Sequence, residues 1–108
     1  MSIEQTAVID FISQSHKGEL RLTISDHLAW DEGGQHLLLL QEKLNAYLRF
    51  IESGELKEKY PRSVGQPIII NLVTKFFPSK QGLTFLEKAK AAISAAGFEL
   101  QVEVQQLN

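Results

Sequence analysis

The side chains most capable of chemistry are gathered in one short stretch of the chain. Asp26, His27, Asp31, Glu32 and His36 place three carboxylates and two imidazoles close together in the sequence. Such groups ligate zinc and other divalent ions. An imidazole oriented by a carboxylate can also act as a general base near neutral pH. The stretch therefore raises two hypotheses, a metal site and a catalytic base.

Both hypotheses compete with a structural interpretation of the same residues. The spacing matches no specific metal motif, because a diglycine at 33–34 separates His27 from His36 and leaves their geometry unconstrained. A base also needs a group to activate, and the sequence contains no G-x-S-x-G elbow or other activated nucleophile. The structural interpretation is that Asp26 forms an Asx-turn and Asp31 caps a helical turn, with both histidines partly exposed. We therefore predict no catalytic residue, no dedicated metal site and no cofactor.

A second group of candidate residues follows the apolar run at 67–77. Lys75, Ser79 and Lys80 surround the predicted start of a helix, where unpaired amides and the helix dipole can hold an anion. No glycine-rich loop precedes this start, so ordinary capping by Ser79 is favoured. Trp30, the only tryptophan, could stack on a ligand, but a lone Trp in a small domain more often fills the core.

The elements that must position these residues follow from the hydrophobic pattern. Residues 7–12 are β-branched and aromatic, and residues 19–25 alternate between polar and apolar, which predicts a β-hairpin. The run at 67–77 is the most apolar in the chain and predicts a central strand. Residues 98–105 alternate without interruption and predict the last strand.

Two helical patterns lie between these strands. From about residue 35 to 53, apolar residues recur at steps of three and four, and Gly54 is well placed to end the helix. Residues 55–60 predict one further helical turn before Pro61. The second helix begins at Ser79 and ends at Gly97. Its predicted buried side consists of Leu83, Leu86, Ala89, Ile93 and Ala96, with Phe85 beside them.

The element order ββαβαβ predicts one α/β (α+β) domain over residues 1–108, a two-layer sandwich with two helices on one face of a mixed sheet. Right-handed crossovers give the strand order 1-2-3-4 with strand 1 antiparallel, and a ferredoxin-like order is the alternative. In the order 1-2-3-4, the second strand (19–25) and the third strand (67–77) end at the same rim of the sheet. Ligands tend to bind at such a rim. The candidate rim residues are Asp26, His27, Trp30, Asp31, His36, Lys75, Ser79 and Lys80.

The same alternation leaves the sheet face opposite the helices largely open. Its predicted residues are Arg21, Thr23, Ile69, Asn71, Val73, Gln101 and Glu103. A mixed apolar and charged surface of this kind suits a homodimer contact or a partner protein. The alternative is that the amino-terminal segment and long polar side chains cover Ile69 and Val73.

Composition narrows the classes of function. With 108 residues, 44% of them hydrophobic, the chain can bury a single core. The absence of cysteine excludes disulfides, thiolate zinc sites and cysteine nucleophiles. The net charge is -2 and the basic residues are scattered, so we expect no nucleic-acid partner. No apolar run approaches the roughly 18–20 residues of a membrane span, and the first residues form no basic signal region, so we expect a cytoplasmic location.

The segment Ile24-Ser25-Asp26-His27-Leu28-Ala29-Trp30-Asp31 and the helix after it resemble a family of small bacterial proteins that carries only a domain-of-unknown-function label. The resemblance extends through Tyr60-Pro61, the apolar strand near 68–75 and the segment 85–100. It implies a stand-alone bacterial protein and no particular activity. Because the sequence shows no catalytic constellation and the predicted open sheet face is not fully polar, we predict a non-enzymatic interaction or accessory protein that uses this face or the rim around Trp30. The alternative is a small-ligand or metal-dependent enzyme at Asp26, His27, Asp31 and His36.

Overall fold

The computed structural model describes residues 11–14, 18–31, 34–61 and 65–105. The elements in chain order are β1 (Phe11–Gln14), β2 (Leu20–Asp26), α1 (Gln35–Glu52), α2 (Glu55–Lys59), β3 (Ile68–Thr74), α3 (Lys80–Ala95) and β4 (Glu99–Val104). The ββαβαβ order is confirmed, and the further helical turn after Gly54 is α2. Gly54 itself has a positive φ of 93°, the left-handed conformation that lets a chain leave one helix and enter another direction.

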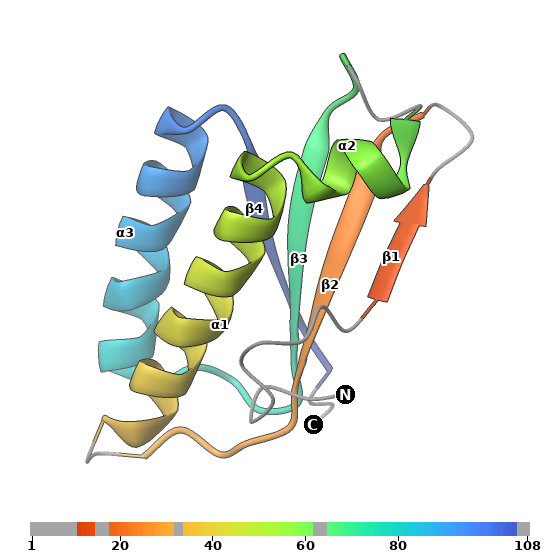
Figure 1. Ribbon diagram of the computed structural model, residues 1–108. Coiled ribbons are helices and arrows are strands. Elements are labelled where there is room, and N and C mark those ends of the chain that lie inside the picture. The colour runs from red at the N-terminus through yellow and green to blue at the C-terminus, as the bar shows by residue number, and fades with distance from the viewer. Residues whose placement is uncertain (1–10, 15–17, 32–33, 62–64, 106–108) are drawn as a thin grey trace.

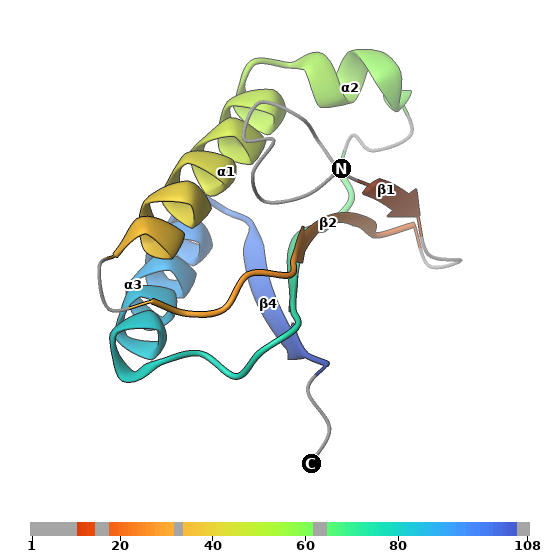
Figure 2. The same ribbon diagram turned by 90° about the horizontal axis from the view of Figure 1, so that it is seen from below.

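The sheet has the predicted order β1-β2-β3-β4. β1 is antiparallel to β2, whereas β2, β3 and β4 are parallel to one another. Figures 1 and 2 show α1 and α3 side by side on one face of this sheet. The two-layer arrangement is therefore confirmed, and the ferredoxin-like order is not adopted.

The first strand differs from its prediction. Residues 7–10 lie outside the described part of the chain, and the described strand continues into Ser13 and Gln14, which we expected to be loop. These two residues are paired with Arg21 and Leu20 in the antiparallel register. The ladder of backbone hydrogen bonds extends the strand beyond the apolar residues that indicate it in the sequence.

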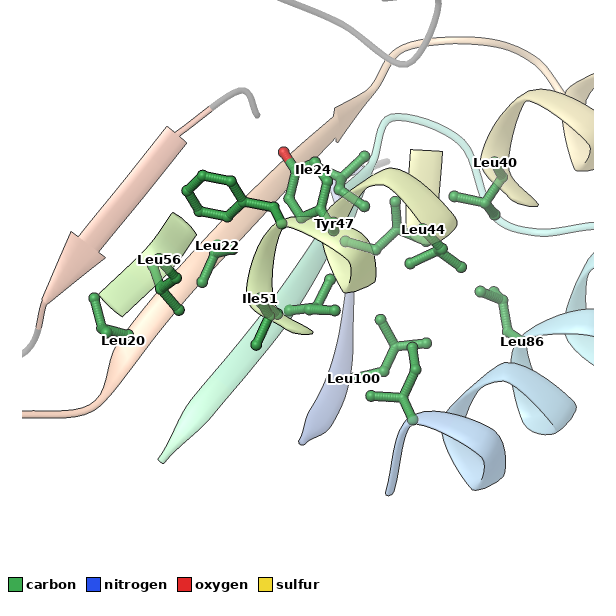
Figure 3. Close-up of a cluster of buried hydrophobic side chains, with 14 residues drawn as sticks. Leu20, Leu22, Ile24, Leu40, Leu44, Tyr47, Ile51, Leu56, Leu86 and Leu100 are labelled. Atoms are coloured by element: carbon green, nitrogen blue, oxygen red, sulfur yellow. The ribbon is translucent and has the colours of Figure 1, made fainter. Parts of the chain in front are cut away.

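The core lies between the sheet and the helices. Alternate residues of β2 and β3 point toward the helices and are fully buried, as period-two alternation requires. Figure 3 shows how side chains from α1, α2, α3 and β4 meet them. The central members of this cluster are Leu20, Leu22, Ile24, Leu40, Leu44, Tyr47, Ile51, Leu56, Ile70, Leu72, Leu86, Ile93 and Leu100.

The buried side of α3 is narrower than the sequence predicts. Leu86 and Ile93 are buried as expected, but Leu83 is 45% exposed and Ala96 is exposed. Leu83 lies toward the outer edge of the sheet, where β4 is the last strand of the described sheet. The predicted apolar stripe is therefore only partly covered by the layer beneath it.

Tyr47 joins α1 to β2, since its hydroxyl donates a 2.6 Å hydrogen bond to the carbonyl oxygen of Thr23. The side chain is fully buried. Replacing Tyr47 with Phe should lower the free energy of unfolding by about 1 kcal/mol, because a partly buried hydrogen bond between α1 and β2 is lost. Urea unfolding measures this, with Tyr60→Phe at a 37% exposed position as the control. Equal losses in both variants would contradict the assignment.

Candidate functional site

The ends of β2 and β3 form one rim with the connections that follow them. Asp26 and Thr74, the last residues of the two strands, are paired in the parallel register. The amide of Lys75 donates to the carbonyl of Asp26 at 2.8 Å, and the indole Nε1 of Trp30 donates to the carbonyl of Phe76 at 3.2 Å. The structure thus brings the Trp30 connection and the β3–α3 connection together.

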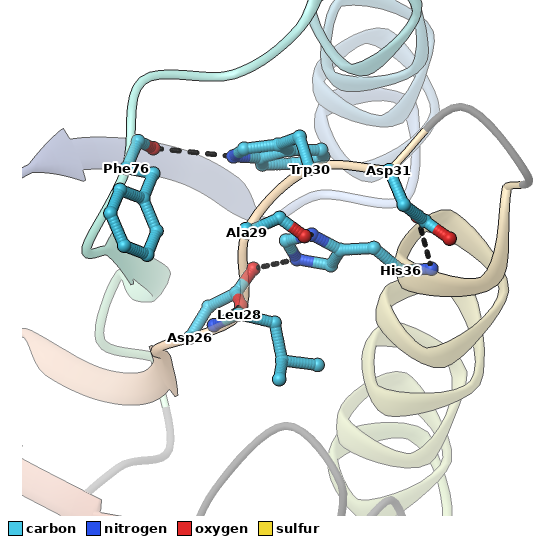
Figure 4. A network of polar contacts seen from close by, with 7 residues as sticks. All are labelled: Asp26, Leu28, Ala29, Trp30, Asp31, His36 and Phe76. Atoms are coloured by element: carbon cyan, nitrogen blue, oxygen red, sulfur yellow. Dashed lines mark hydrogen bonds and ion pairs between the residues drawn. The ribbon is translucent and has the colours of Figure 1, made fainter.

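A buried acid and imidazole pair lies at the centre of this rim (Figure 4). Asp26 is 1% exposed and His36 is 3% exposed. Asp26 Oδ2 and His36 Nε2 are 2.5 Å apart, and Asp26 Oδ1 accepts a hydrogen bond from the amide of Leu28 at 3.2 Å. Asp26 therefore makes the expected Asx-turn, while the expectation that His36 is partly exposed is wrong.

Both ring nitrogens of His36 are engaged by the protein. Nδ1 lies 3.1 Å from the carbonyl oxygen of Ala29, and a carbonyl can only accept, so Nδ1 carries a proton and donates it. Nε2 lies 2.5 Å from Asp26 Oδ2, within hydrogen-bond distance. A general base needs a ring nitrogen that reaches a reacting group. The pair instead ties the end of β2 to the first turn of α1.

The two aspartates of this stretch are shifted in opposite directions. Burial raises the pKa of Asp26 above its ordinary value of 3.8, although the hydrogen bond and charge of His36 and the amide of Leu28 act against it. The pKa of Asp31 is lowered, chiefly because its carboxylate accepts the amide hydrogen of His36 and, to a lesser degree, that of Gln35. Asp31 thus caps the start of α1, as the structural interpretation of the sequence predicts.

Trp30 fills the space between the two helix starts. Its ring stacks on His36 with a centroid distance of 4.0 Å and an interplanar angle of 28°. On the α3 side it lies against Gly82, where an added Cβ would come within 2.7 Å of indole atoms Cε3 and Cζ3. Trp30 is therefore a packing residue that joins α1 to α3.

The remaining rim candidates lie nearer the surface. Ser79 Oγ accepts the amide hydrogen of Gly82 at 3.0 Å, so it caps α3. His27, Lys75 and Lys80 are exposed, and the ammonium of Lys75 lies 5.5 Å from the centroid of the Phe76 ring. Among the described residues, no group of three or more His, Asp or Glu side chains is arranged to hold a metal ion.

A polar network crosses the helix-free face of the sheet. The Arg21 guanidinium donates to Gln101 Oε1 at 2.9 Å and to Glu19 Oε1 at 3.3 Å. Arg21 belongs to β2 and Gln101 to β4, so their hydrogen bond passes over β3. Ile69, paired with Arg21 across the ladder, is only 5% exposed. Of the other predicted face residues, Thr23, Asn71 and Val73 are half-buried and Glu103 is exposed.

Sequence reasoning missed two features. The first is Lys43, which is fully buried on α1 with its ammonium 5.7 Å from the centroid of the Tyr47 ring. Its position three residues after Leu40 and four before Tyr47 places it on the buried side of the helix and could have indicated this burial. The second is a hollow of about 230 Å³ beside β4, which we call the edge hollow. It is lined by Phe77, Pro78, Leu83, Leu86, Glu87, Lys90, Val102 and Val104.

Comparison with known proteins gives one result. A model of a family of unknown function (DUF6572) matches residues 1–106. No curated protein and no solved structure gives a significant match. In the described part of the chain, no helix has the length and apolar character needed to cross a membrane.

The shifted aspartates predict opposite pH dependences of stability. A raised pKa at Asp26 contributes stability that is complete below pH 3.8 and is lost as the pH rises through the folded value. The lowered pKa of Asp31 contributes stability that is present above pH 3.8 and is lost as the pH falls through the folded value. With rising pH, the unfolding free energy of the wild type should therefore fall relative to Asp26→Asn and rise relative to Asp31→Asn. Urea unfolding at several pH values measures both, and parallel curves for the two variants would contradict the assignment.

The contact between Trp30 and Gly82 predicts that Gly82→Ala is destabilising despite the better helix propensity of alanine. The added methyl group must displace the indole ring, at a cost of about 1–3 kcal/mol for an overpacked site. Denaturant unfolding should show the loss, and the emission of the single Trp should shift. Gln81→Ala, at an exposed neighbouring position, is the control. Unchanged stability and emission for Gly82→Ala would show that the contact is loose.

Proposed function

We propose that this chain, which belongs to the family of unknown function DUF6572, is a non-enzymatic protein whose role is to bind another protein. The observation that carries the proposal is an apolar surface exposed beside β4. Phe77 is 65% exposed and Leu83 is 45% exposed, and both line the edge hollow. Large apolar side chains grouped at the surface mark sites of protein contact.

The shape of this surface supports a protein partner. Val102 and Val104 form one wall of the edge hollow and are half-buried, while Pro78 and Leu86 form its buried base. An apolar side chain of a partner can enter such a hollow and act as the anchor of an interface. The charged residues Glu87 and Lys90 lie at its border and supply the polar rim that interfaces commonly have.

The rim geometry supports a non-enzymatic role. The acid and imidazole pair that could do proton transfer is buried, and both nitrogens of His36 are used within the protein. Asp31 is occupied by the amides at the start of α1. Three of the four residues proposed for a ligand or metal site are therefore engaged within the protein, and the fourth, His27, is an exposed imidazole. The alternative of an enzyme at this rim has less support.

The helix-free face extends the proposed binding surface. Gln101 and Glu103 belong to both the face and β4, so a partner at the edge hollow can also reach Asn71 and Val73 on β3. Ile69 is a poor probe of this face, because a charge at a 5% exposed position would disturb folding. A cytoplasmic location in a bacterium, expected from the sequence, is part of the same proposal.

The proposal predicts that Leu83→Lys abolishes partner binding while Leu38→Lys does not. Both positions are exposed leucines on helices, at 45% and 57%, but Leu38 lies on α1 and does not line the edge hollow. The immobilised variants are incubated with extract of the source organism, and bound proteins are quantified by mass spectrometry. The proteins of interest are those that both the wild type and Leu38→Lys retain. Leu83→Lys should retain at least about tenfold less of each of them. Equal retention by both variants would contradict the proposal.

A further inference from the structure

We infer that the partner at this surface is a second copy of the chain, joined edge to edge through β4 into one continuous sheet. The inference rests on the proposed function, because it names the occupant of the same surface. Figure 2 shows β4 beside α3, at the side of the sheet away from β1. Within the described sheet, β4 pairs only with β3. An edge strand of this kind presents backbone groups to another strand.

The direction of the free backbone groups follows from one hydrogen bond. The amide of Gln105 donates to the carbonyl of Thr74 at 2.8 Å, so this residue turns its backbone groups toward β3. Backbone groups of successive strand residues point alternately to the two sides of the strand. Leu100, Val102 and Val104 therefore direct their amides and carbonyls away from β3. These residues are the ones that a second strand can pair with.

A two-fold axis at Val102 satisfies all of these groups in antiparallel pairing. Val102 then lies opposite Val102 of the second copy, and Leu100 lies opposite Val104. Each of these pairs exchanges two backbone hydrogen bonds, as outward-directed residues do when they oppose one another directly. The contact is isologous, because both copies use the same strand. Both β4 edges are therefore occupied in the dimer, and no further copy can add to the sheet through β4.

The charges on β4 favour this register over its neighbours. With the axis at Val102, Gln101 lies opposite Glu103 of the second copy and Glu99 lies opposite Gln105, so amides face carboxylates. Moving the axis to Gln101 sets Glu99 against Glu103, and moving it to Glu103 sets two glutamates against each other. Like charges directly across a strand pair are destabilising. The polar side of β4 therefore favours Val102 over Gln101 and Glu103 as the centre.

The side of β4 that faces α3 is complementary in the same register. Leu83, Glu87 and Lys90 follow one side of α3 at steps of four and three and line the hollow together with Val102. The axis at Val102 sets α3 antiparallel to its copy. The inference places Glu87 of each copy opposite Lys90 of the other, with Leu83 and Phe77 covered at the two ends of the contact.

Sedimentation equilibrium of the purified chain tests the inference, over about 1 µM to about 1 mM, where modest interfaces dissociate. The wild type should be a concentration-dependent dimer, Leu83→Lys should weaken it at least about tenfold, and Leu38→Lys should leave it unchanged. Urea unfolding of each variant establishes that it is folded.

Charge reversal at Glu87 and Lys90 tests the geometry itself. Glu87→Lys and Lys90→Glu should each dimerise at least about tenfold more weakly, because both cross-axis pairs become repulsive. An equimolar mixture of the two variants should dimerise again, since every cross-axis pair is then attractive. Both positions are exposed, so a folding defect is not expected.

Two results would overturn the inference: a wild type that stays monomeric throughout, or a dimer that neither charge reversal affects. Neither result decides the proposed function. A monomeric wild type whose capture of another protein is lost in Leu83→Lys retains the binding role with a different partner. Equal capture by Leu83→Lys and Leu38→Lys removes that role whatever the state of association.

Discussion

The arrangement of this fold depends on one buried polar contact, the pair formed by Asp26 and His36. A carboxylate withdrawn from water costs several kcal/mol unless a partner compensates it, and breaking such a pair on one side is strongly destabilising. The pair joins the last residue of β2 to the first turn of α1. Because His36 also donates to Ala29 and stacks on Trp30, the path of the connection is fixed by the same ring. Trp30 in turn contacts Gly82 and the carbonyl of Phe76, so the position of α3 depends on it as well.

This dependence explains why the residues with the most reactive chemistry do not form an open site. Asp26 and His36 satisfy one another, Asp31 satisfies amides of α1, and Ser79 satisfies an amide of α3. Asp26, Asp31 and Ser79 each accept a backbone amide hydrogen where a strand ends or a helix begins, and such amides would otherwise lack a partner. The proposed binding surface lies instead where apolar side chains face solvent, as Phe77 and Leu83 do. The amino-terminal turn of α3 thus holds Trp30, whereas the proposed binding surface lies along the side of α3 that borders β4.

Local patterns in the sequence were sufficient for most of the architecture. Strict alternation located β2 and β4, the continuous apolar run located β3, and the rule for crossover handedness gave the strand order. The turn at Asp26 and the caps at Asp31 and Ser79 were also predictable, because short polar side chains bond to nearby amides. The burial of His36 was not, since it depends on a carboxylate from another element and a Trp ring above it. The exposure of Leu83 was not predictable either: helix periodicity says which residues share a face, but not how far the sheet extends beneath that face.

That last limit has a physical consequence for β4. A strand order that progresses in one direction ends on a parallel strand with no neighbour, and such an edge invites pairing unless charges or bulges block it. The glutamates of β4, Glu99 and Glu103, point to the helix-free face and not along the edge, so they do not block backbone pairing. They restrict it instead, because they exclude the registers in which they meet each other and permit the one centred on Val102. Charges that exclude the registers centred on Gln101 and Glu103, together with the apolar residues Val102 and Val104 on the other side of the strand, restrict pairing at this edge without preventing it.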